Sequence, residues 1–280
     1  MELKHIATRD GRLSSFLKEE MKMSTGLVNR LKWQQKIFVN GVPQHNDFAV
    51  KIDDVITALL DEEEPNYPPQ DGALTVLYED AYLLSVDKPA GMLIHPSHSK
   101  NDGTLANFVL GYYVRTGQKC AFHPVTRLDR DTFGIVLLTK NSHVHALMQQ
   151  TECQKTYHAL VRGGPVEEEG IICAPIARKP LPSLLREVRA DGKESITGFR
   201  VLQRLDGYSL LALTPVTGRT HQLRVHCAYM GFPILGDPQY GNGAADFGLS
   251  HQLLCAKKLE LTHPITGEHL VLESKMDARL

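Results

Sequence analysis

The interpretation of the sequence depends on one stretch, 127-RLDRDTFGIVLLTK-140. Its first half holds two arginines and two aspartates, and its second half is an apolar run typical of a buried strand. Alternation along Arg-Leu-Asp turns Leu128 toward the core and leaves Arg127 and Asp129 on the other side. A carboxylate between arginines is expected to stay ionised, which suits a nucleophile or an electrostatic stabiliser. Taken alone, however, the segment favours a salt-bridged surface turn.

The region around this stretch contains more strand patterns than helix patterns. Strands are expected at 74–78, 82–86, 135–139, 156–161, 196–202 and 208–214, with a strand pair around 253–261. Helices are expected at 104–116, capped by Thr104 and ended by Gly117, at 141–150, and at 220–230, with a start at Gly218 and Thr220. Because strands and helices do not alternate strictly, the pattern predicts an α+β fold with a mixed, mostly antiparallel sheet and packed helices.

An acidic, proline-rich break, 61-DEEEPNYPPQDG-72, divides the chain. Prolines remove helix donors and like charges repel, so the break is typical of an extended linker; a long surface loop inside one domain is the alternative. The residues before it predict a small α+β unit. Its expected parts are a helix over 12–21, a second helix capped by Ser24, a hairpin at Asn40-Gly41 and a strand at 55–60.

Composition excludes several classes of protein. The net charge is −1, so any nucleic-acid site must be a local patch. The chain has no G-x-G-x-x-G, no P-loop, no H-E-x-x-H and no C-x-x-C, so we expect no cofactor and no metal site. Its start lacks an apolar leader and its cysteine number is odd, which predicts a cytoplasmic protein without membrane spans.

Four further segments change the interpretation of the first: 87-DKPAG-91, 155-KTYHAL-160, 217-TGRTHQLRVH-226 and 235-LGDPQYG-241. Together with RLDRDTFG, and in this order, they resemble the motifs of the RluA-type RNA pseudouridine synthases. The unit before the break resembles the S-four-like RNA-binding module. The resemblance therefore implies an S-four-like domain at 1–60, a linker at 61–73 and a catalytic domain at 74–280, which isomerises uridine in RNA and needs no cofactor.

The resemblance also implies roles for individual residues. Asp129 stands at the position of the nucleophile, which attacks carbon 6 of uracil or the anomeric carbon, with a glycal route also open. Tyr157 would stack on the flipped base and assist a proton transfer, and Arg224 would pair with Asp129. Contacts with the substrate are expected from four further residues, namely Arg127, Arg219, His221 and Leu254. The partner is RNA, with ribosomal RNA favoured over transfer RNA by the two-domain layout, and we expect a monomer.

The chain departs from the family pattern at Phe133, where serine is usual, and at Cys255, where histidine is usual. A large ring at 133 could reshape or block the pocket, so a non-catalytic RNA-binding protein is one rival. A hydrolase that uses Asp129 with Asp131 is another, but it needs two carboxylates in different protonation states. Trp33 is expected to point away from the core, either to stack on a base or to pack on the linker or catalytic domain.

Overall fold

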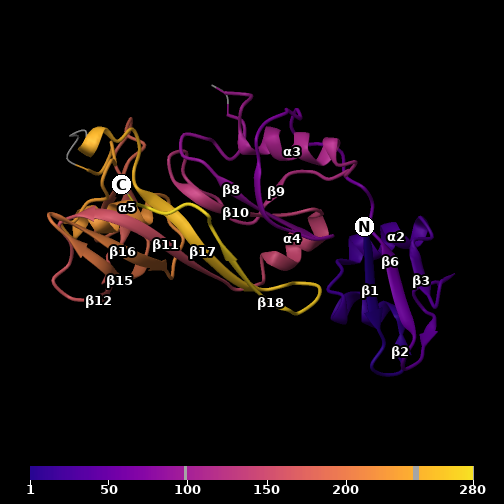
Figure 1. Cartoon of the computed structure of the whole chain (residues 1–280). Coiled ribbons are helices and arrows are strands. Elements are labelled where there is room, and N and C mark those ends of the chain that lie inside the picture. Colours follow the sequence, from indigo (N-terminus) through magenta and orange to yellow (C-terminus); the bar gives the residue numbers. More distant parts are fainter. Residues whose placement is uncertain (98–99, 242–245, 280) are drawn as a thin grey trace.

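The structure, a computed structural model, describes residues 1–97, 100–241 and 246–279. Figure 1 shows a small unit at one end of the molecule, formed by residues 1–60 and here called the front unit. The remaining chain is built on a single large sheet that runs through most of the length of the molecule.

The front unit has a four-stranded antiparallel sheet with two helical segments against it. Its strands, in sheet order, are β1 Glu2–Ile6, β6 Val55–Leu59, β3 Ile37–Val39 and β4 Val42–Pro43, and β2 Gly11–Arg12 pairs separately with β5 Ala49–Val50. Its helical segments are α1 Leu13–Ser15, which continues as a π-helical turn at Phe16–Glu20, and α2 Thr25–Trp33.

Local signals in the front unit are confirmed. The Ser24 hydroxyl accepts a hydrogen bond from the Leu27 N–H at 3.2 Å, as an N-cap does. The hairpin between β3 and β4 turns on Asn40 and Gly41, both at positive φ. The Trp33 side chain is 84% exposed, so packing on the linker or on the large-sheet region was the wrong alternative.

The large sheet has ten strands in the order β12-β15-β16-β11-β17-β10-β8-β7, with β18 beside β17 and β9 beside β10. The bounds of these strands are β7 Thr75–Glu79, β8 Leu83–Lys88, β9 His123–Pro124, β10 Phe133–Thr139, β11 Cys153–Arg162, β12 Glu169–Cys173, β15 Ile196–Leu205, β16 Tyr208–Pro215, β17 Leu254–Thr262 and β18 His269–Glu273. A separate hairpin joins β13 Ile176–Arg178 to β14 Arg186–Val188. Every pair in the large sheet is antiparallel except β10 with β17, so the predicted α+β class with a mixed, mostly antiparallel sheet is confirmed.

The parallel contact between β10 and β17 joins the two halves of the large sheet. It consists of only two residue pairs, Phe133 with Cys255 and Gly134 with Ala256. Gly134 has φ +106, and a Cβ there would lie 2.8 Å from the Ala256 nitrogen and overlap the Ala256 oxygen. Glycine is therefore required where the two strands meet.

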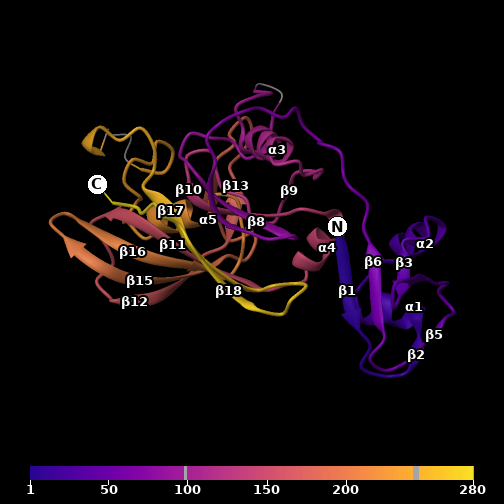
Figure 2. The ribbon, with the colours of Figure 1, turned by 45° about the vertical axis from the view of Figure 1, so that its right-hand side comes forward.

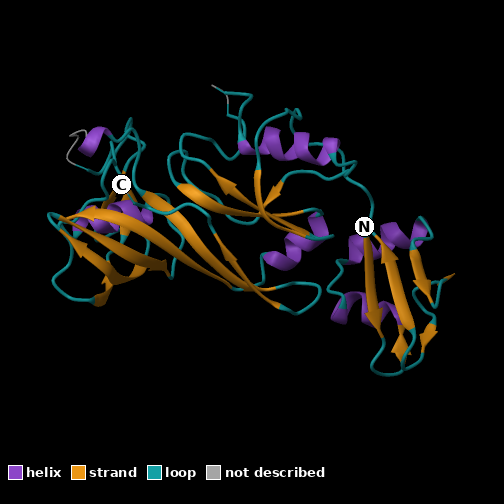
Figure 3. Cartoon of the chain, viewed as in Figure 1, coloured by secondary structure: helices purple, strands orange, loops and turns teal. Residues whose placement is uncertain are grey.

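Helices cover both faces of β10 (Figure 3). Val136 and Leu138 pack in one cluster with α3 Leu105–Arg115, while Ile135 and Leu137 pack in another with α4 Ser142–Met148. Burial on both faces explains the unbroken apolar run of this strand. The third helix of this region is α5 Gln222–Tyr229, and no helix in the described ranges is long and apolar enough to cross a membrane.

The acidic break between β6 and β7 has no helix or strand and runs from the front unit to the side of α3 (Figure 2). Its polar groups bind the large-sheet region. The Glu63 carboxylate accepts the Ser142 N–H at 2.9 Å, and the Asn66 amide oxygen accepts the Phe122 N–H at 2.9 Å. The Gln70 amide oxygen accepts the Gly103 N–H at 2.7 Å. The segment is thus extended, but hydrogen bonds along its length hold it against the large-sheet region.

Several expectations about element bounds were wrong. The helix expected from Gly218 and Thr220 begins at Gln222, with His221 as N-cap in the left-handed region. The strand pair expected around 253–261 is the single strand β17, whose hairpin partner β18 was not predicted. Seven other strands were missed, namely β1, β2, β5, β9, β12, β13 and β14. Five of these seven strands have only two or three residues, which is too short to show a strand periodicity.

The junction at Gly134 yields a stability prediction. Gly134→Ala should lower the free energy of unfolding by about 3 kcal/mol or more, because the added methyl group combines strained φ with overlap against β17. Gly198→Ala in β15 is the matched control, since its Cβ would meet nothing closer than 3.7 Å. The control should be neutral or stabilising by up to about 1 kcal/mol in urea unfolding. Equal stability of the two variants would contradict the account of the junction.

Candidate active site

A cavity of about 720 Å³ lies beside the strand junction. Its walls come from the loop before β10, from β11 and β17, and from the loop that leads into α5. All seven residues that the sequence singled out line it, namely Arg127, Asp129, Tyr157, Arg219, His221, Arg224 and Leu254. Segments more than 90 residues apart in the chain therefore converge on one space.

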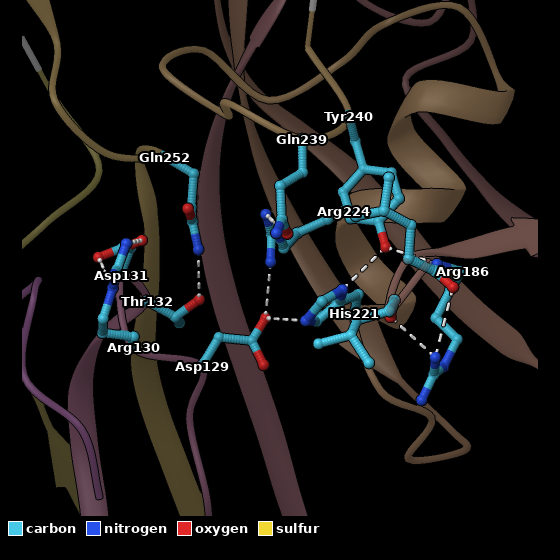
Figure 4. A network of polar contacts seen from close by, with 12 residues as sticks. Asp129, Arg130, Asp131, Thr132, Arg186, His221, Arg224, Gln239, Tyr240 and Gln252 are labelled. Atoms are coloured by element: carbon cyan, nitrogen blue, oxygen red, sulfur yellow. Dashed lines mark hydrogen bonds and ion pairs between the residues drawn. The ribbon is translucent and has the colours of Figure 1, made fainter. Parts of the chain in front are cut away.

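The Asp129 carboxylate is held at the cavity wall by two basic side chains (Figure 4). Arg224 Nη1 donates to its Oδ2 at 3.1 Å, and His221 Nε2 lies 3.8 Å from the same oxygen. About 31% of the Asp129 side chain remains exposed. The carboxylate is thus oriented from one side and open to a ligand on the other.

The Arg224 guanidinium is almost fully buried and contacts several polar groups and one aromatic ring. Its Nε and Nη2 donate to Asp237 at 2.7 and 2.8 Å, and Nη2 also donates to Gln239 Oε1 at 2.9 Å. The Tyr240 ring lies 5.0 Å from the guanidinium carbon. Burial opposes the charge, but the carboxylates of Asp237 and Asp129 outweigh it and raise the pKa of Arg224. The arginine is therefore a fixed cation that presents its Nη1 group to Asp129.

Asp237 is a site residue whose role the sequence did not reveal. It is buried, and its carboxylate also accepts the N–H groups of Gln239 and Tyr240 at 2.9 and 3.1 Å. Burial tends to raise its pKa, but Arg224 and these N–H groups bring the pKa below the ordinary aspartate value. The segment LGDPQYG was visible in the sequence, but its pairing with Arg224 across 13 residues was not.

Tyr157 and Leu254 form the apolar side of the cavity on the neighbouring strands β11 and β17. Burial and the nearby Asp129 carboxylate raise the pKa of Tyr157 to about 12. The phenol is therefore protonated at neutral pH and can donate a hydrogen bond. Arg127 and Arg219 are exposed at the cavity surface, where the Arg219 Nε donates to the Glu194 carbonyl at 3.0 Å.

A second buried cation secures the loop that carries Asp129. The Lys88 ammonium donates to the carbonyls of Pro89, Met92 and Arg130 at 2.8–2.9 Å. Burial lowers the pKa of Lys88 to about 8, against the opposing attraction of Asp131 and Asp129. The DKPAG segment is thereby tied to the residue after Asp129, a structural link that the sequence did not show.

Phe133 does not shape the cavity, so the expectation of a reshaped pocket was wrong. Its ring is buried in a separate cluster with residues such as Leu160, Leu253 and Cys255. The cavity wall includes Thr132 instead, whose hydroxyl accepts a hydrogen bond from Gln252 Nε2 at 3.1 Å. Pairing with β17 decides which way residue 133 points, because neighbouring residues of a strand face opposite sides.

Comparison with known proteins gives a consistent result. A family model described as RNA pseudouridylate synthase matches residues 82–229. The chain is 36% identical over 278 residues to the uncharacterised RNA pseudouridine synthase YhcT of Bacillus subtilis, covering 96% of this chain and 91% of that protein. It is 38% identical over 223 residues to the ribosomal large subunit pseudouridine synthase D of Xanthomonas campestris, covering 74% and 67%. The solved structure titled Human RNA Pseudouridylate Synthase Domain Containing 1 matches with a TM-score of 0.61 and 26% identity, covering 76% of this chain and 87% of that one.

The buried pair of Arg224 and Asp237 yields a second stability prediction. Asp237→Asn should cost about 3–5 kcal/mol at pH 7, because it leaves a buried guanidinium partly uncompensated. Since the native pKa of Asp237 is depressed, its contribution is full above the unfolded-state pKa and is lost as pH falls through the native value. The stability gap between wild type and variant should therefore narrow below about pH 4.

The matched control is Asp191→Asn, which removes an exposed partner of Arg189 and should leave the free energy of unfolding almost unchanged, because solvent screens this ion pair. Urea unfolding at pH 7 and at lower pH measures both variants. If Asp237→Asn lowers the free energy of unfolding at pH 7 by no more than Asp191→Asn does, the account of the buried pair is contradicted.

Proposed function

This chain belongs to the RNA pseudouridylate synthase family and is an isomerase that acts on RNA. From this premise we propose that Asp129 is its nucleophile and that large-subunit ribosomal RNA is its substrate. The observation that carries the first part is the Asp129 carboxylate, which faces the cavity while Arg224 holds one of its oxygens. A salt-bridged surface turn would not place a partly exposed carboxylate on a buried cation at a cavity wall.

The reaction breaks the bond between the ribose and uracil nitrogen 1 and forms a bond from the ribose to carbon 5. The hydrogen on carbon 5 leaves as a proton and nitrogen 1 takes up a proton, so atoms and electrons balance without an oxidant or a cofactor. The uridine must leave its stack to enter the cavity. A cavity of about 720 Å³ is in the range of small-molecule sites and accommodates one nucleotide.

Other side chains of the cavity receive roles from their surroundings. Tyr157 stacks against the flipped base, and its protonated hydroxyl serves in proton transfer. Leu254 supplies the apolar wall beside the base. Arg127, Arg219 and His221 contact the substrate, with the two exposed arginines suited to phosphate or to the gap left by the base.

The target class rests on relatives and on the front unit. The Xanthomonas campestris relative is named for the large ribosomal subunit. Residues 1–60, proposed as an S-four-like RNA-binding domain joined by the linker 61–73 to the catalytic domain 74–280, carry nine Lys/Arg and seven Asp/Glu. The exposed Trp33 offers a face on which a base could stack. We place the protein in the cytoplasm as a monomer, and the five free cysteines support a reducing compartment.

Neither rival gains support from the site. The non-catalytic reading required Phe133 to block the pocket, and this ring lies in a separate cluster. The hydrolase reading required a second carboxylate of different protonation. Asp131 is instead held by two hydrogen bonds from Arg130 at 3.0 and 2.9 Å.

Asp129→Asn should reduce isomerisation by at least about 10⁴-fold, because loss of the nucleophile removes the covalent route. RNA binding and folding should persist. The assay is tritium release from RNA labelled at carbon 5 of uridine. Asp131→Asn is the matched control in the same loop and should stay within about tenfold of wild type. Measurable turnover by folded Asp129→Asn would disprove the assignment of the nucleophile.

The ribosomal assignment predicts a defect in the cell. Large-subunit ribosomal RNA from a strain lacking this gene should miss at least one pseudouridine, which the wild-type gene restores and an Asp129→Asn gene does not. Carbodiimide modification followed by primer extension maps the sites. Loss of pseudouridine from transfer RNA alone would refute the ribosomal substrate and leave the enzyme activity intact.

A further inference from the structure

A second cavity, of about 460 Å³, lies next to the first. It is bounded by the β13–β14 hairpin, by residues 191–193 and by the loop that leads into α5. We call it the basic cavity, because its walls include four cationic side chains, Arg178, Arg186, Lys193 and Arg219.

The charges of the basic cavity are not balanced within the part of the chain that the structure describes. None of the four cations forms an ion pair with a carboxylate there; the three arginines donate only to backbone carbonyls, at Ser183, Leu184, Leu185 and Glu194. The single acidic residue of the lining, Asp191, is paired with Arg189 at 2.5 Å. Cations gathered in a hollow repel one another and attract an anion, so the cavity is suited to phosphate.

The basic cavity is continuous with the proposed active site. Gly218, Arg219 and Thr220 line both spaces. An RNA strand whose target uridine enters the first cavity therefore passes over these residues, and its neighbouring phosphates reach the second. A single side chain, Arg219, touches both cavities.

The hairpin that bounds the basic cavity is also bonded to the nucleophile's surroundings (Figure 4). The Arg186 N–H donates to the Tyr240 hydroxyl at 2.9 Å, and that hydroxyl lies 2.8 Å from His221 Nδ1. His221 Nε2 in turn lies 3.8 Å from Asp129. A short chain of polar contacts thus fixes the position of a phosphate on the hairpin relative to Asp129.

We propose that the basic cavity binds backbone phosphates of the substrate RNA next to the target uridine, an inference that rests on the proposed function. Each phosphate contact releases counterions from RNA, so losing a contact flattens the dependence of binding on salt. Arg178 and Lys193 are the residues to change, since both are exposed and neither lines the active-site cavity.

The experiment uses the full chain and total RNA, labelled with tritium at carbon 5 of uridine, from a strain lacking this gene. For Arg178→Gln/Lys193→Gln, kcat/KM at about 0.15 M salt should fall about tenfold, and the slope of log kcat/KM against log salt should shrink by about 1.5. The rate at saturating RNA should stay within about twofold of wild type, since binding rather than chemistry is affected.

Two control variants isolate the effect of charge at this place. Arg178→Lys/Lys193→Arg keeps both charges and should keep the wild-type slope. Arg200→Gln/Lys275→Gln removes the same charge at exposed positions that line neither cavity, and it should also keep the slope. A fall in slope for this distant pair equal to that for Arg178→Gln/Lys193→Gln would refute a local site.

The remaining outcomes are distinguishable. No tritium release by wild type defeats the proposed function itself. Release by wild type with an unchanged salt slope for Arg178→Gln/Lys193→Gln defeats only the phosphate site. Inhibition by inorganic phosphate at constant ionic strength, present in wild type and absent in that variant while the salt slope is unchanged, would assign the cavity to free phosphate and overturn the proposal.

Discussion

The active site depends on the close approach of β10 and β17 at Gly134. Two residue pairs join the two halves of the large sheet there, and a side chain at 134 would collide with the backbone of Ala256. Asp129 lies five residues before Gly134 on one half, while Arg224 and Tyr157 belong to the other. The cavity exists because these halves meet at this point. A position that requires glycine for geometric reasons thus fixes where a carboxylate faces an arginine.

Electrostatics then determine how Asp129 is held. The charge of the buried Arg224 must be compensated, and the buried Asp237 supplies a bidentate partner. Asp237 therefore fixes Arg224, and the contact with Arg224 orients the Asp129 carboxylate without burying it. Lys88 secures the same loop by binding the Arg130 carbonyl. Asp129 is the partly exposed end of a network in which Arg224, Asp237 and Lys88 are buried.

Sequence reasoning predicted the features that depend on local signals. Thr104 and Gly117 bound α3, and Asn40-Gly41 forms the hairpin of the front unit, because caps and turns are encoded within a few residues. It failed where contacts between distant parts of the chain determine the position or direction of a side chain. Asp237 was missed because its partner is on another element, and Phe133 was misjudged because its direction follows from its register with β17. The start of α5 was misplaced because His221, in a left-handed conformation, replaces an ordinary cap.

In the account proposed above, the two cavities, the shared loop 218–220 and the Tyr240–His221 contact form one surface that binds RNA and presents one uridine to Asp129. The most direct test is a crystal structure of the Asp129→Asn protein with substrate RNA. The account predicts an unstacked uridine in the cavity of about 720 Å³, with its ribose–uracil bond about 3–3.5 Å from the side chain of residue 129. A target uridine that stays stacked in the RNA, or that lies against a different carboxylate, would contradict it.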